Sequence, residues 1–505
     1  MFDNIQKLKD ILCRYGVDYL LVNATNQWLE EEARLEENDR YLLTGFSGDT
    51  GDALITKEFE IYLFVDGRYH IQAEQEIKKN VKIVKLQIGQ RQDEEICKFV
   101  KNNSKFGFFS KKISLFRLEK IKLYLQDKNI EMVEINDLLI KQKINKEHKG
   151  KKTGCKPRDF KVEDAMFITD LNEIAYLTQI RDFSDNYKSI IRNKLFIDKN
   201  GSRTVFSEND DKYESLLKNY EDNIIVDKNT INVYDFNLIK KPIIKNNCIS
   251  ELKSIKTDEE ICAMKKAFTI SDKSLLEVRE YIEKSESGAI SEFDICEKLK
   301  ECFYKYGATG LSFKPIVAIN QNSASPHYNA SSKDVYLNDG DLVLIDCGIY
   351  CEEGLATDTT RVFVKGEPSD LHKKVYTFVL MTFLQCMENI NKTPYELNHI
   401  AHQLLDNKID GFVFNHSLGH GVGISVHDGL PSLSYGEIAK QPLKDNMCFT
   451  IEPGLYNKDY FGIRLENTFY RNNGKNISFN NLNFEKKLID YSLLKGQESY
   501  IAKYL

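Results

Sequence analysis

The segment 341–366, DLVLIDCGIYCEEGLATDTTRVFVKG, predicts a β-hairpin that carries one acid on each arm. LVLID and ATDTTRVFV are rich in apolar and β-branched residues, and Gly354 in the CEEG between them suits a turn that needs positive φ. Such a hairpin sets Asp346 and Asp358 near each other across the ladder. Two carboxylates this close repel unless a cation lies between them. Because acids beside a turn are also common on exposed hairpins, this segment leaves both interpretations open.

A second segment, NHSLGHGVGISVHDG (415–429), combines four glycines with His416, His420 and His427, three of the nine histidines in the chain. Histidine is a transition-metal ligand and a proton carrier near neutral pH. Glycine lets the backbone pass close to a ligand. A lone histidine would more often be structural, but this cluster indicates a functional site.

Two further acids follow apolar strands. In MCFTIEPGLY (447–456), Glu452 ends a predicted strand, and an isolated buried carboxylate needs a partner because its desolvation is costly. In YFGIRLENTFY (460–470), Glu466 alternates with Arg464 on another predicted strand. The plain alternative there is an Arg–Glu pair on the face of a strand.

The segments together are more specific than any one of them. They offer four carboxylates and one imidazole: Asp346, Asp358, Glu452, Glu466 and His420. Four negative charges exceed what one divalent cation balances, whereas two suffice. Oxygen-rich ligation with one nitrogen suits Mn²⁺, Co²⁺, Fe²⁺ or Zn²⁺. Two such ions about 3.5–4 Å apart can share a hydroxide and stabilise a tetrahedral transition state.

The length of 505 residues predicts two or three domains. In residues 1–150, YLLVN (19–23) and EIYLFVDGRY (60–69) look like strands and HIQAEQEIKK (70–79) like a helix, which suggests an α/β domain.

We expect a second α/β domain over 151–250, with strand-rich AMFITDLNEIAYLT (165–178) and KLFIDKNG (194–201). The last domain, 251–505, contains every strong motif. It opens on a charged helix that Thr257 and Glu260 start as a capping box.

Charge and cysteine usage exclude several classes of protein. A net charge of −6 and a pI of about 6.0 argue against a general nucleic-acid binder. The basic stretch 141–158 has no interleaved aromatics, so it predicts a linker and only secondarily a nucleic-acid patch. Eleven cysteines without a CxxC pair indicate reduced thiols. No secretion signal and no apolar run of about 18 residues is present, so we expect a soluble, cytoplasmic protein with no membrane partner.

In chain order, DCG…TDTTR, GHGVG…VHDG, TIEPGLY and GIRLEN resemble the metallopeptidase family that includes methionine aminopeptidase, prolidase and aminopeptidase P. The resemblance implies a pita-bread catalytic domain with two divalent metal ions. It implies that Asp346 and Asp358 are ligands, with Asp358 bridging. It further implies that His420 and Glu452 ligate one metal and that Glu466 bridges both.

The resemblance also implies active-site groups that do not bind metal. Among the predicted ligands, Glu452 is in addition our candidate for moving a proton. ASPHY (324–328) is similar to the family segment with a substrate-side histidine, here His327. His427 matches a second active-site histidine, which would bind substrate, and Arg464 matches an active-site arginine.

The N-terminal half resembles the two creatinase-like domains of the long, three-domain aminopeptidase P type. That type implies α/β (α+β) architecture and hydrolysis of the bond between an N-terminal residue and a following proline. It further implies proline-containing peptides as substrates, a homodimer, and Mn²⁺ as the first expectation, with Zn²⁺, Co²⁺ or Fe²⁺ as alternatives.

Alternatives to this function remain at the sequence level. Prolidase, which acts on Xaa-Pro dipeptides, uses the same site. A non-catalytic pita-bread binding module or a metal-free creatinase would have lost ligands that are all present here. A nucleophilic Cys347 is disfavoured because its side chain should point to the opposite face from Asp346, into packing. Asp346 and Asp358 are twelve positions apart where the family usually has eleven, and we expect the tip near 352–354 to absorb the extra residue.

Overall fold

The computed structural model describes residues 2–31, 33–87, 89–136, 150–389 and 391–494, which form two compact units. The first comprises Met1–Glu147, Asp159–Ile174 and Arg192–Cys248, and the second comprises His148–Arg158, Ala175–Ile191 and Ile249–Leu505. The predicted domain boundaries at residues 150 and 250 stay predictions. Residues 141–149 of the predicted linker lie outside the described residues.

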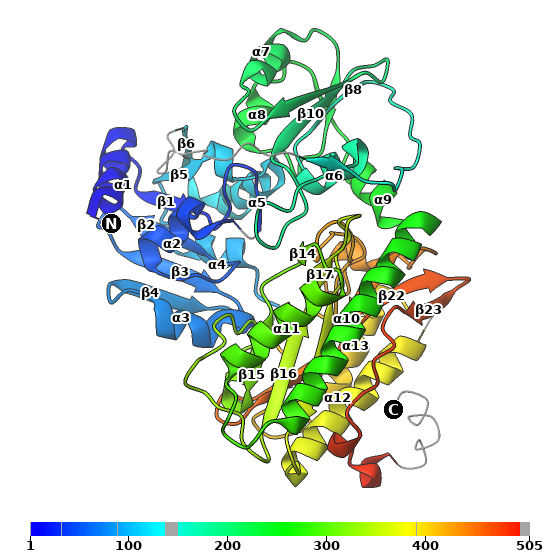
Figure 1. Cartoon of the computed structure of the whole chain (residues 1–505). Coiled ribbons are helices and arrows are strands. Elements are labelled where there is room, and N and C mark those ends of the chain that lie inside the picture. Colours follow the sequence, from blue (N-terminus) through cyan, green and yellow to red (C-terminus); the bar gives the residue numbers. More distant parts are fainter. Residues whose placement is uncertain (1, 32, 88, 137–149, 390, 495–505) are drawn as a thin grey trace. The chain divides into compact units, whose positions relative to one another are not determined.

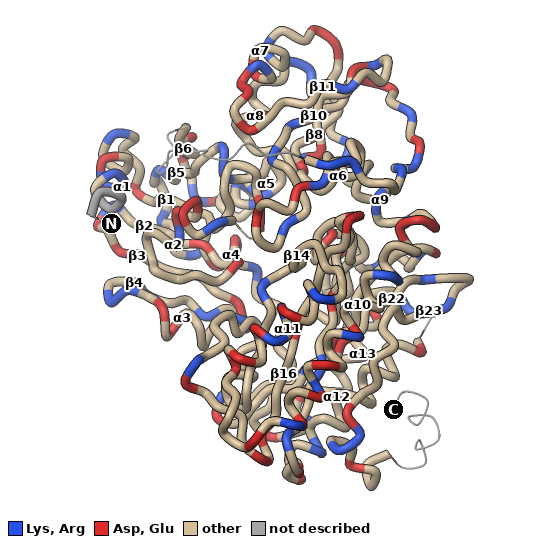
Figure 2. The backbone as a smooth tube through the Cα atoms, viewed as in Figure 1, with Lys and Arg blue, Asp and Glu red and all other residues tan. Residues whose placement is uncertain are grey.

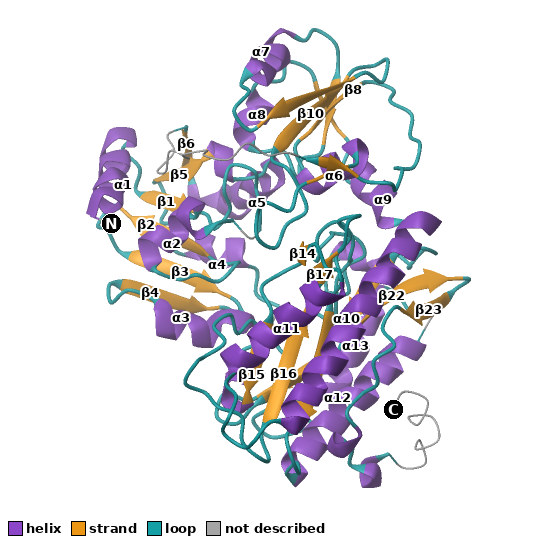
Figure 3. Ribbon diagram, viewed as in Figure 1, coloured by secondary structure: helices purple, strands orange, loops and turns teal. Residues whose placement is uncertain are grey.

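The first unit contains a mixed sheet of six described strands in the order β4-β3-β2-β1-β5-β6 (Figures 1 and 3). Its strands are β1 (Tyr19–Val22), β2 (Asp52–Thr56), β3 (Ile61–Val65), β4 (Val81–Lys85), β5 (Lys105–Phe109) and β6 (Glu131–Ile135). Its helices are α1 (Phe2–Tyr15), α2 (Asp39–Thr44), α3 (His70–Glu76), α4 (Gln92–Lys98) and α5 (Leu115–Leu125). The predicted strand at 19–23 and helix at 70–79 are confirmed. The predicted strand at 60–69 ends early, because the Asp66 carboxylate accepts from the backbone N–H of Arg68 and starts a 3₁₀ turn.

A second sheet of five described strands has the order β11-β10-β8-β12-β13. Its strands are β8 (Ala165–Ile168), β10 (Asn193–Ile197), β11 (Arg203–Ser207), β12 (Ile224–Val226) and β13 (Pro242–Ile244). The helices of this stretch are α6 (Leu171–Thr178), α7 (Lys212–Asn219) and α8 (Val233–Asn237). The strand prediction for 165–178 is right for β8 and wrong for α6. The Asp170 side chain accepts from the N–H of Glu173 and caps that helix.

The second unit contains a three-stranded sheet, β15-β16-β18, with long helices beside it (Figure 1). Its helices are α9 (Cys248–Ser254), α10 (Asp258–Lys284), α11 (Glu292–Tyr306), α12 (Asp370–Glu388) and α13 (Pro394–Leu405). Its strands are β7 (Lys151–Lys152), β9 (Ile180–Arg181), β14 (Gly310–Leu311), β15 (Ile316–Ile319), β16 (Leu342–Cys347), β17 (Ile349–Tyr350), β18 (Thr359–Val364), β19 (Cys448–Ile451), β20 (Gly454–Tyr456), β21 (Gly462–Arg464), β22 (Asn467–Asn472) and β23 (Lys475–Ser478). The capping box of Thr257 and Glu260 at the start of α10 is confirmed.

Alternation along β16 separates two hydrophobic cores. Leu342 and Leu344 belong to the core that includes α12 and α13, whereas Val343, Ile345 and Cys347 belong to the core that includes α10 and α11. Because successive side chains of a strand point to opposite faces, Asp346 lies on the α12–α13 side and Cys347 on the other. Cys347 is fully buried among apolar residues, as predicted for a packing residue.

The predicted hairpin at 341–366 is confirmed, and its register is the same up to the tip. The antiparallel pairing of β16 with β18 continues in an isolated bridge between Tyr350 and Ala356. The extra residue therefore lies in the tip, where Gly354 has a φ of 65° and donates its N–H to the carbonyl of Cys351. The tip adopts this turn without shifting the register at Asp346.

Within the described residues, we find no helix long and apolar enough to cross a membrane. Positively and negatively charged residues are interspersed along the backbone of the described residues (Figure 2).

Candidate metal centre

The hairpin register places both predicted aspartates on one face. Asp346 pairs with Thr360, and the same register sets Asp358 two residues away, on the face shared with Thr360. Val362 and Val364, further along that face, pack in the α12–α13 core. The two carboxylates thus meet diagonally across the ladder. The charge of Asp358 contributes to the pKa of Asp346, so the two groups interact.

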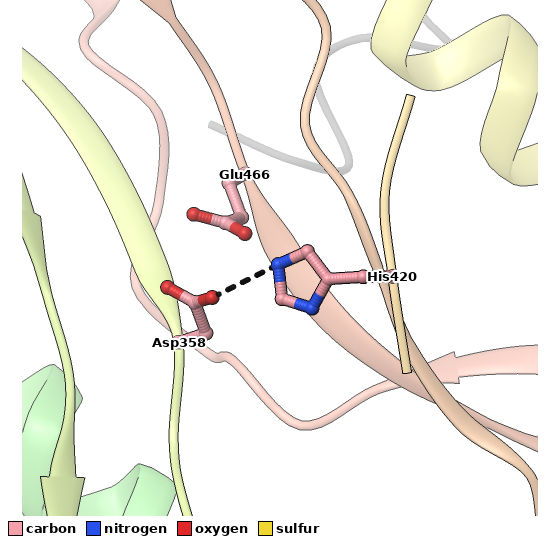
Figure 4. A group of neighbouring side chains, drawn as sticks. All are labelled: Asp358, His420 and Glu466. Atoms are coloured by element: carbon pink, nitrogen blue, oxygen red, sulfur yellow. Dashed lines mark ion pairs between the residues drawn. The ribbon is translucent and has the colours of Figure 1, made fainter. Parts of the chain in front are cut away.

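Asp358, His420 and Glu466 converge from three separate segments (Figure 4). Each offers one ligand atom, and these atoms all lie within 4.8 Å of one another. His420 Nε2 is 3.4 Å from Asp358 Oδ2 and also 3.4 Å from Glu452 Oε1. The imidazole therefore lies between the carboxylates of two predicted ligands.

Glu466 lies in a break between two strands, so its predicted place on a strand is wrong. β21 ends at Arg464, and β22 begins at Asn467. The Glu466 N–H donates to the carbonyl of Thr360 over 3.2 Å, and the Thr360 hydroxyl donates to Glu466 Oε2 over 2.7 Å. These bonds to β18 turn the side chain toward Asp358.

One threonine orients two of the predicted ligands. The hydroxyl of Thr450, in β19, accepts a hydrogen bond from the backbone N–H of His420 over 3.0 Å. The same hydroxyl donates to Glu452 Oε1 over 3.4 Å. Glu452 directly follows β19, and its N–H donates to the carbonyl of Leu418 over 2.9 Å. Hydrogen bonds between β19 and the histidine segment thus fix the relative positions of His420 and Glu452.

Asp346 has a different partner. Arg464 donates from Nη2 to Asp346 Oδ2 over 2.6 Å, so the arginine pairs with Asp346 and not with Glu466 as the strand alternative supposed. Asp346 Oδ1 and Glu466 Oε1 are buried and have no hydrogen-bond partner within the described residues. Buried polar atoms are normally satisfied, so orphaned carboxylate oxygens at this point indicate a missing partner.

The electrostatics of the cluster favour added positive charge. Burial and the neighbouring carboxylates of Asp358, Glu452 and Asp346 raise the pKa of Glu466 well above its usual range. Burial raises the pKa of Glu452 to about 7 despite His420 and Arg464 nearby. Burial also raises the pKa of Asp346. Three buried carboxylates and the partly buried Glu452 face too little positive charge, and the oxygen-rich donor set with one imidazole fits divalent metal ions.

His427 lies next to the predicted ligands. Its ring centroid is 4.3 Å from that of His420, at an interplanar angle of 85°. The structure therefore brings together the two histidines that the sequence singled out for different roles.

The His327 segment approaches the same cluster through its backbone. Arg464 donates from Nη1 to the carbonyl of Pro326 over 3.2 Å, directly before His327. Glu292, fully buried at the start of α11, accepts four hydrogen bonds from the segment 319–332 on both sides of His327.

Sequence reasoning gave no role to Tyr456, and it noted His416 only as part of a cluster. The Tyr456 hydroxyl accepts from Arg464 Nη1 over 2.9 Å and lies 2.8 Å from His416 Nε2. Burial raises the pKa of Tyr456 to about 12. This chain of contacts joins His416 to Asp346 through Arg464. The sequence signal was Tyr456 in the EPGLY that follows Glu452.

Two segments of the chain match models of known protein families. Residues 262–472 match the model of metallopeptidase family M24, and residues 4–142 match that of the Creatinase/Prolidase N-terminal domain. The structure is similar to that of X-prolyl aminopeptidase from Caenorhabditis elegans, with a TM-score of 0.83 and 20% identity over 97% of this chain and 90% of that one. That protein is described as a cytosolic enzyme with a di-nuclear active site.

Two curated relatives differ in how much of the chain they match. Xaa-Pro aminopeptidase 1 of Dictyostelium discoideum is 29% identical over 99% of this chain and 91% of its own length. Xaa-Pro dipeptidase of Pyrococcus horikoshii is 34% identical over 44% of this chain and 61% of its own length. The predicted creatinase-like N-terminal fold and pita-bread catalytic fold are confirmed. The chain thus combines an N-terminal segment similar to the Creatinase/Prolidase N-terminal domain with a C-terminal segment similar to metallopeptidase family M24.

Proposed function

We propose that this protein is an Xaa-Pro aminopeptidase whose two divalent metal ions are held by five residues: Asp346, Asp358, His420, Glu452 and Glu466. The observation that carries the metal centre is the convergence of Asp358, His420 and Glu466, beside buried carboxylate oxygens without partners. The full-length likeness to an Xaa-Pro aminopeptidase supports the substrate class, because the dipeptidase relatives match only part of the chain.

When bound, the two cations would supply the charge that activates water and offsets the negative charge developing on the scissile carbonyl oxygen. The protein's own residues would orient these groups. Thr360 holds the Glu466 carboxylate, and Thr450 holds His420 beside Glu452. Arg464 fixes one oxygen of Asp346 and leaves the other free for a cation.

Glu452 is our candidate for proton transfer, because it is a proposed ligand that directly follows β19 and lies beside His420, where the activated water would be. His427, against His420, and His327, in the segment braced by Glu292, would hydrogen-bond the substrate. The free amine of the peptide would lie near Asp346. An X–Pro bond offers no amide N–H, so recognition must depend on the shape of the ring.

Mn²⁺ is the metal that we propose first, because hard oxygen ligands dominate the set. The homodimer and the cytoplasmic location stay predictions. Sedimentation of the purified chain would test the first of them.

Comparing an Xaa-Pro-Pro tripeptide with an Xaa-Pro dipeptide, after Mn²⁺ loading, tests the function. We expect release of the first residue from the tripeptide, and no release from a tripeptide whose second residue is alanine. Cleavage of the dipeptide without the tripeptide would instead identify a prolidase. A protein that binds two metals and cleaves neither peptide would be a binding module.

A further inference from the structure

A buried carboxylate directly follows His427. The Asp428 side chain is 1% exposed and forms ion pairs with two lysines, Lys253 and Lys256, whose side chains are 5% and 2% exposed. Lys253 lies in α9, and Lys256 directly precedes the cap of α10. The charged run that the sequence marked only as a helix start therefore reaches the histidine segment.

The two lysines hold Asp428 through both its side chain and its backbone. Lys253 Nζ donates to the Asp428 carboxylate and, over 3.0 Å, to the Asp428 carbonyl. Lys256 Nζ donates to Asp428 Oδ2 over 3.2 Å and to the Lys253 carbonyl over 2.8 Å. Contacts to both the carboxylate and the carbonyl fix the peptide plane after Asp428 as well as its side-chain direction. The orientation of the preceding residue, His427, is restricted with it.

The loop that joins the two active-site histidines closes on Asp428. The Asp428 N–H donates to the carbonyl of Gly421 over 2.8 Å. A Cβ at Gly423 would lie 1.9 Å from Asp428 Oδ2, so the backbone passes directly against the carboxylate. At the other end, Thr450 holds the N–H of His420. Both ends of the loop are fixed, and the two imidazoles meet edge to face, with their ring centroids 4.3 Å apart.

Stability does not account for this arrangement. Buried ion pairs recover little more than their desolvation cost and are often replaceable by apolar groups. Two ammonium groups meet one carboxylate here, and the nearby buried Glu260 supplies a second negative charge. Burial alone would raise the pKa of Asp428, but Lys253 and Lys256 lower it below its ordinary value. The carboxylate therefore stays ionised and paired throughout the neutral range.

We propose that Asp428, clamped by Lys253 and Lys256, is a positioning residue that sets the His427 imidazole against the ring of His420. The inference rests on the proposed function. It extends the site to two lysines upstream of the residues that the M24 family model matches.

Asp428→Asn tests the clamp, because it keeps the volume and removes the charge. We expect kcat on the Xaa-Pro-Pro tripeptide to fall on the order of 10–100-fold, as for partners that orient active-site groups. KM should change less than about threefold, with two metals still bound per chain by calorimetric titration. A crystal structure of Asp428→Asn should show the His427 ring displaced from His420. Lys256→Arg, which keeps a buried cation, should recover most of the rate lost in Lys256→Met.

The buried pair Lys112–Asp39 in the first unit provides a matched control. Lys112→Met should destabilise the protein without changing kcat. The proposal is overturned if folded Asp428→Asn keeps kcat within twofold with His427 in place, or if its loss of rate tracks a loss of metal. If Asp428→Asn does not fold, Lys253→Gln tests the proposal by the same measurements of kcat, bound metal and the position of the His427 ring. An inactive wild-type protein that binds two metals would refute the proposed function, while the ring displacement in the crystal structure would still test the clamp.

Discussion

Two buried acidic clusters in this protein are neutralised in different ways. In the first unit, Arg192 is 4% exposed and contacts Glu30, Glu37 and Glu208, with Nη1 and Nη2 each 2.7 Å from a carboxylate oxygen. Burial opposes the charge of the guanidinium, but the three acids outweigh burial and raise the pKa of Arg192. A protein side chain thus supplies the central cation.

In the second unit, the carboxylates of the candidate metal centre meet without such a central side chain. Within the described residues, Arg464 pairs with Asp346, and His420 lies between Asp358 and Glu452. Glu466 Oε1 and Asp346 Oδ1 have no hydrogen-bond partner in the part of the chain that the structure describes. The difference teaches that acidity does not itself mark a metal site. What indicates a metal site is a buried acidic cluster whose negative charge is not balanced by neighbouring basic side chains.

Removing a proposed metal ligand should have the largest effect. Glu466→Gln should lower kcat/KM by ~10³-fold or more, because it removes a charge that we propose to hold the cations. The metal bound per chain should fall with it, as measured by elemental analysis. Glu352→Gln, an exposed acid at the hairpin tip, should change neither quantity. Full activity with two metals in Glu466→Gln would show that this cluster is not the centre.

Removing the cation of the first cluster should affect folding and not catalysis. Arg192→Met removes the cation that Glu30, Glu37 and Glu208 share and should cost roughly 3–5 kcal/mol in the free energy of unfolding. Urea unfolding measures that loss, and peptide kinetics on the folded fraction should show an unchanged kcat. Lys57→Met, which breaks the exposed Lys57–Asp18 pair, should leave the free energy of unfolding nearly unchanged. A changed kcat in Arg192→Met would contradict the view that the first cluster serves folding alone.

Metal binding should stabilise the second unit by mass action. Mn²⁺ at 100 times its dissociation constant should add about 2.7 kcal/mol for each site that is absent in the unfolded chain. Thermal unfolding of chelator-treated protein, with and without Mn²⁺, measures the change. An unaltered melting temperature in the wild type would argue that the acids fold without needing cations.

The metal-free protein should lose stability as pH rises. Glu452 has a folded-state pKa of about 7 against an ordinary value of 4.5, so the folded state keeps a proton that the unfolded chain has released. Its stabilising contribution is complete below about pH 4.5 and is lost as pH rises through about 7. We expect a loss on the order of 1–3 kcal/mol between pH 5 and pH 8. Glu452→Gln should flatten this dependence, and a wild-type stability that rises across the window would contradict it.

Local signals predicted much of the catalytic domain. The hairpin of β16 and β18 and the capping box at Thr257 follow from neighbouring residues, and the structure has both. Long-range partners could not be predicted in the same way. Glu466 lies in a strand break held by Thr360, and Lys256 reaches Asp428 across 172 residues. Such pairs depend on how the strands and helices pack, which no local pattern contains.

The number of metal ions that the chain binds tests the central claim most directly. Titration of chelator-treated protein with Mn²⁺, followed by anomalous diffraction, should place two ions among Asp346, Asp358, His420, Glu452 and Glu466. Asp358→Asn should bind fewer. A wild-type chain that binds no ion at these residues, or an Asp358→Asn chain that keeps both, would contradict the account.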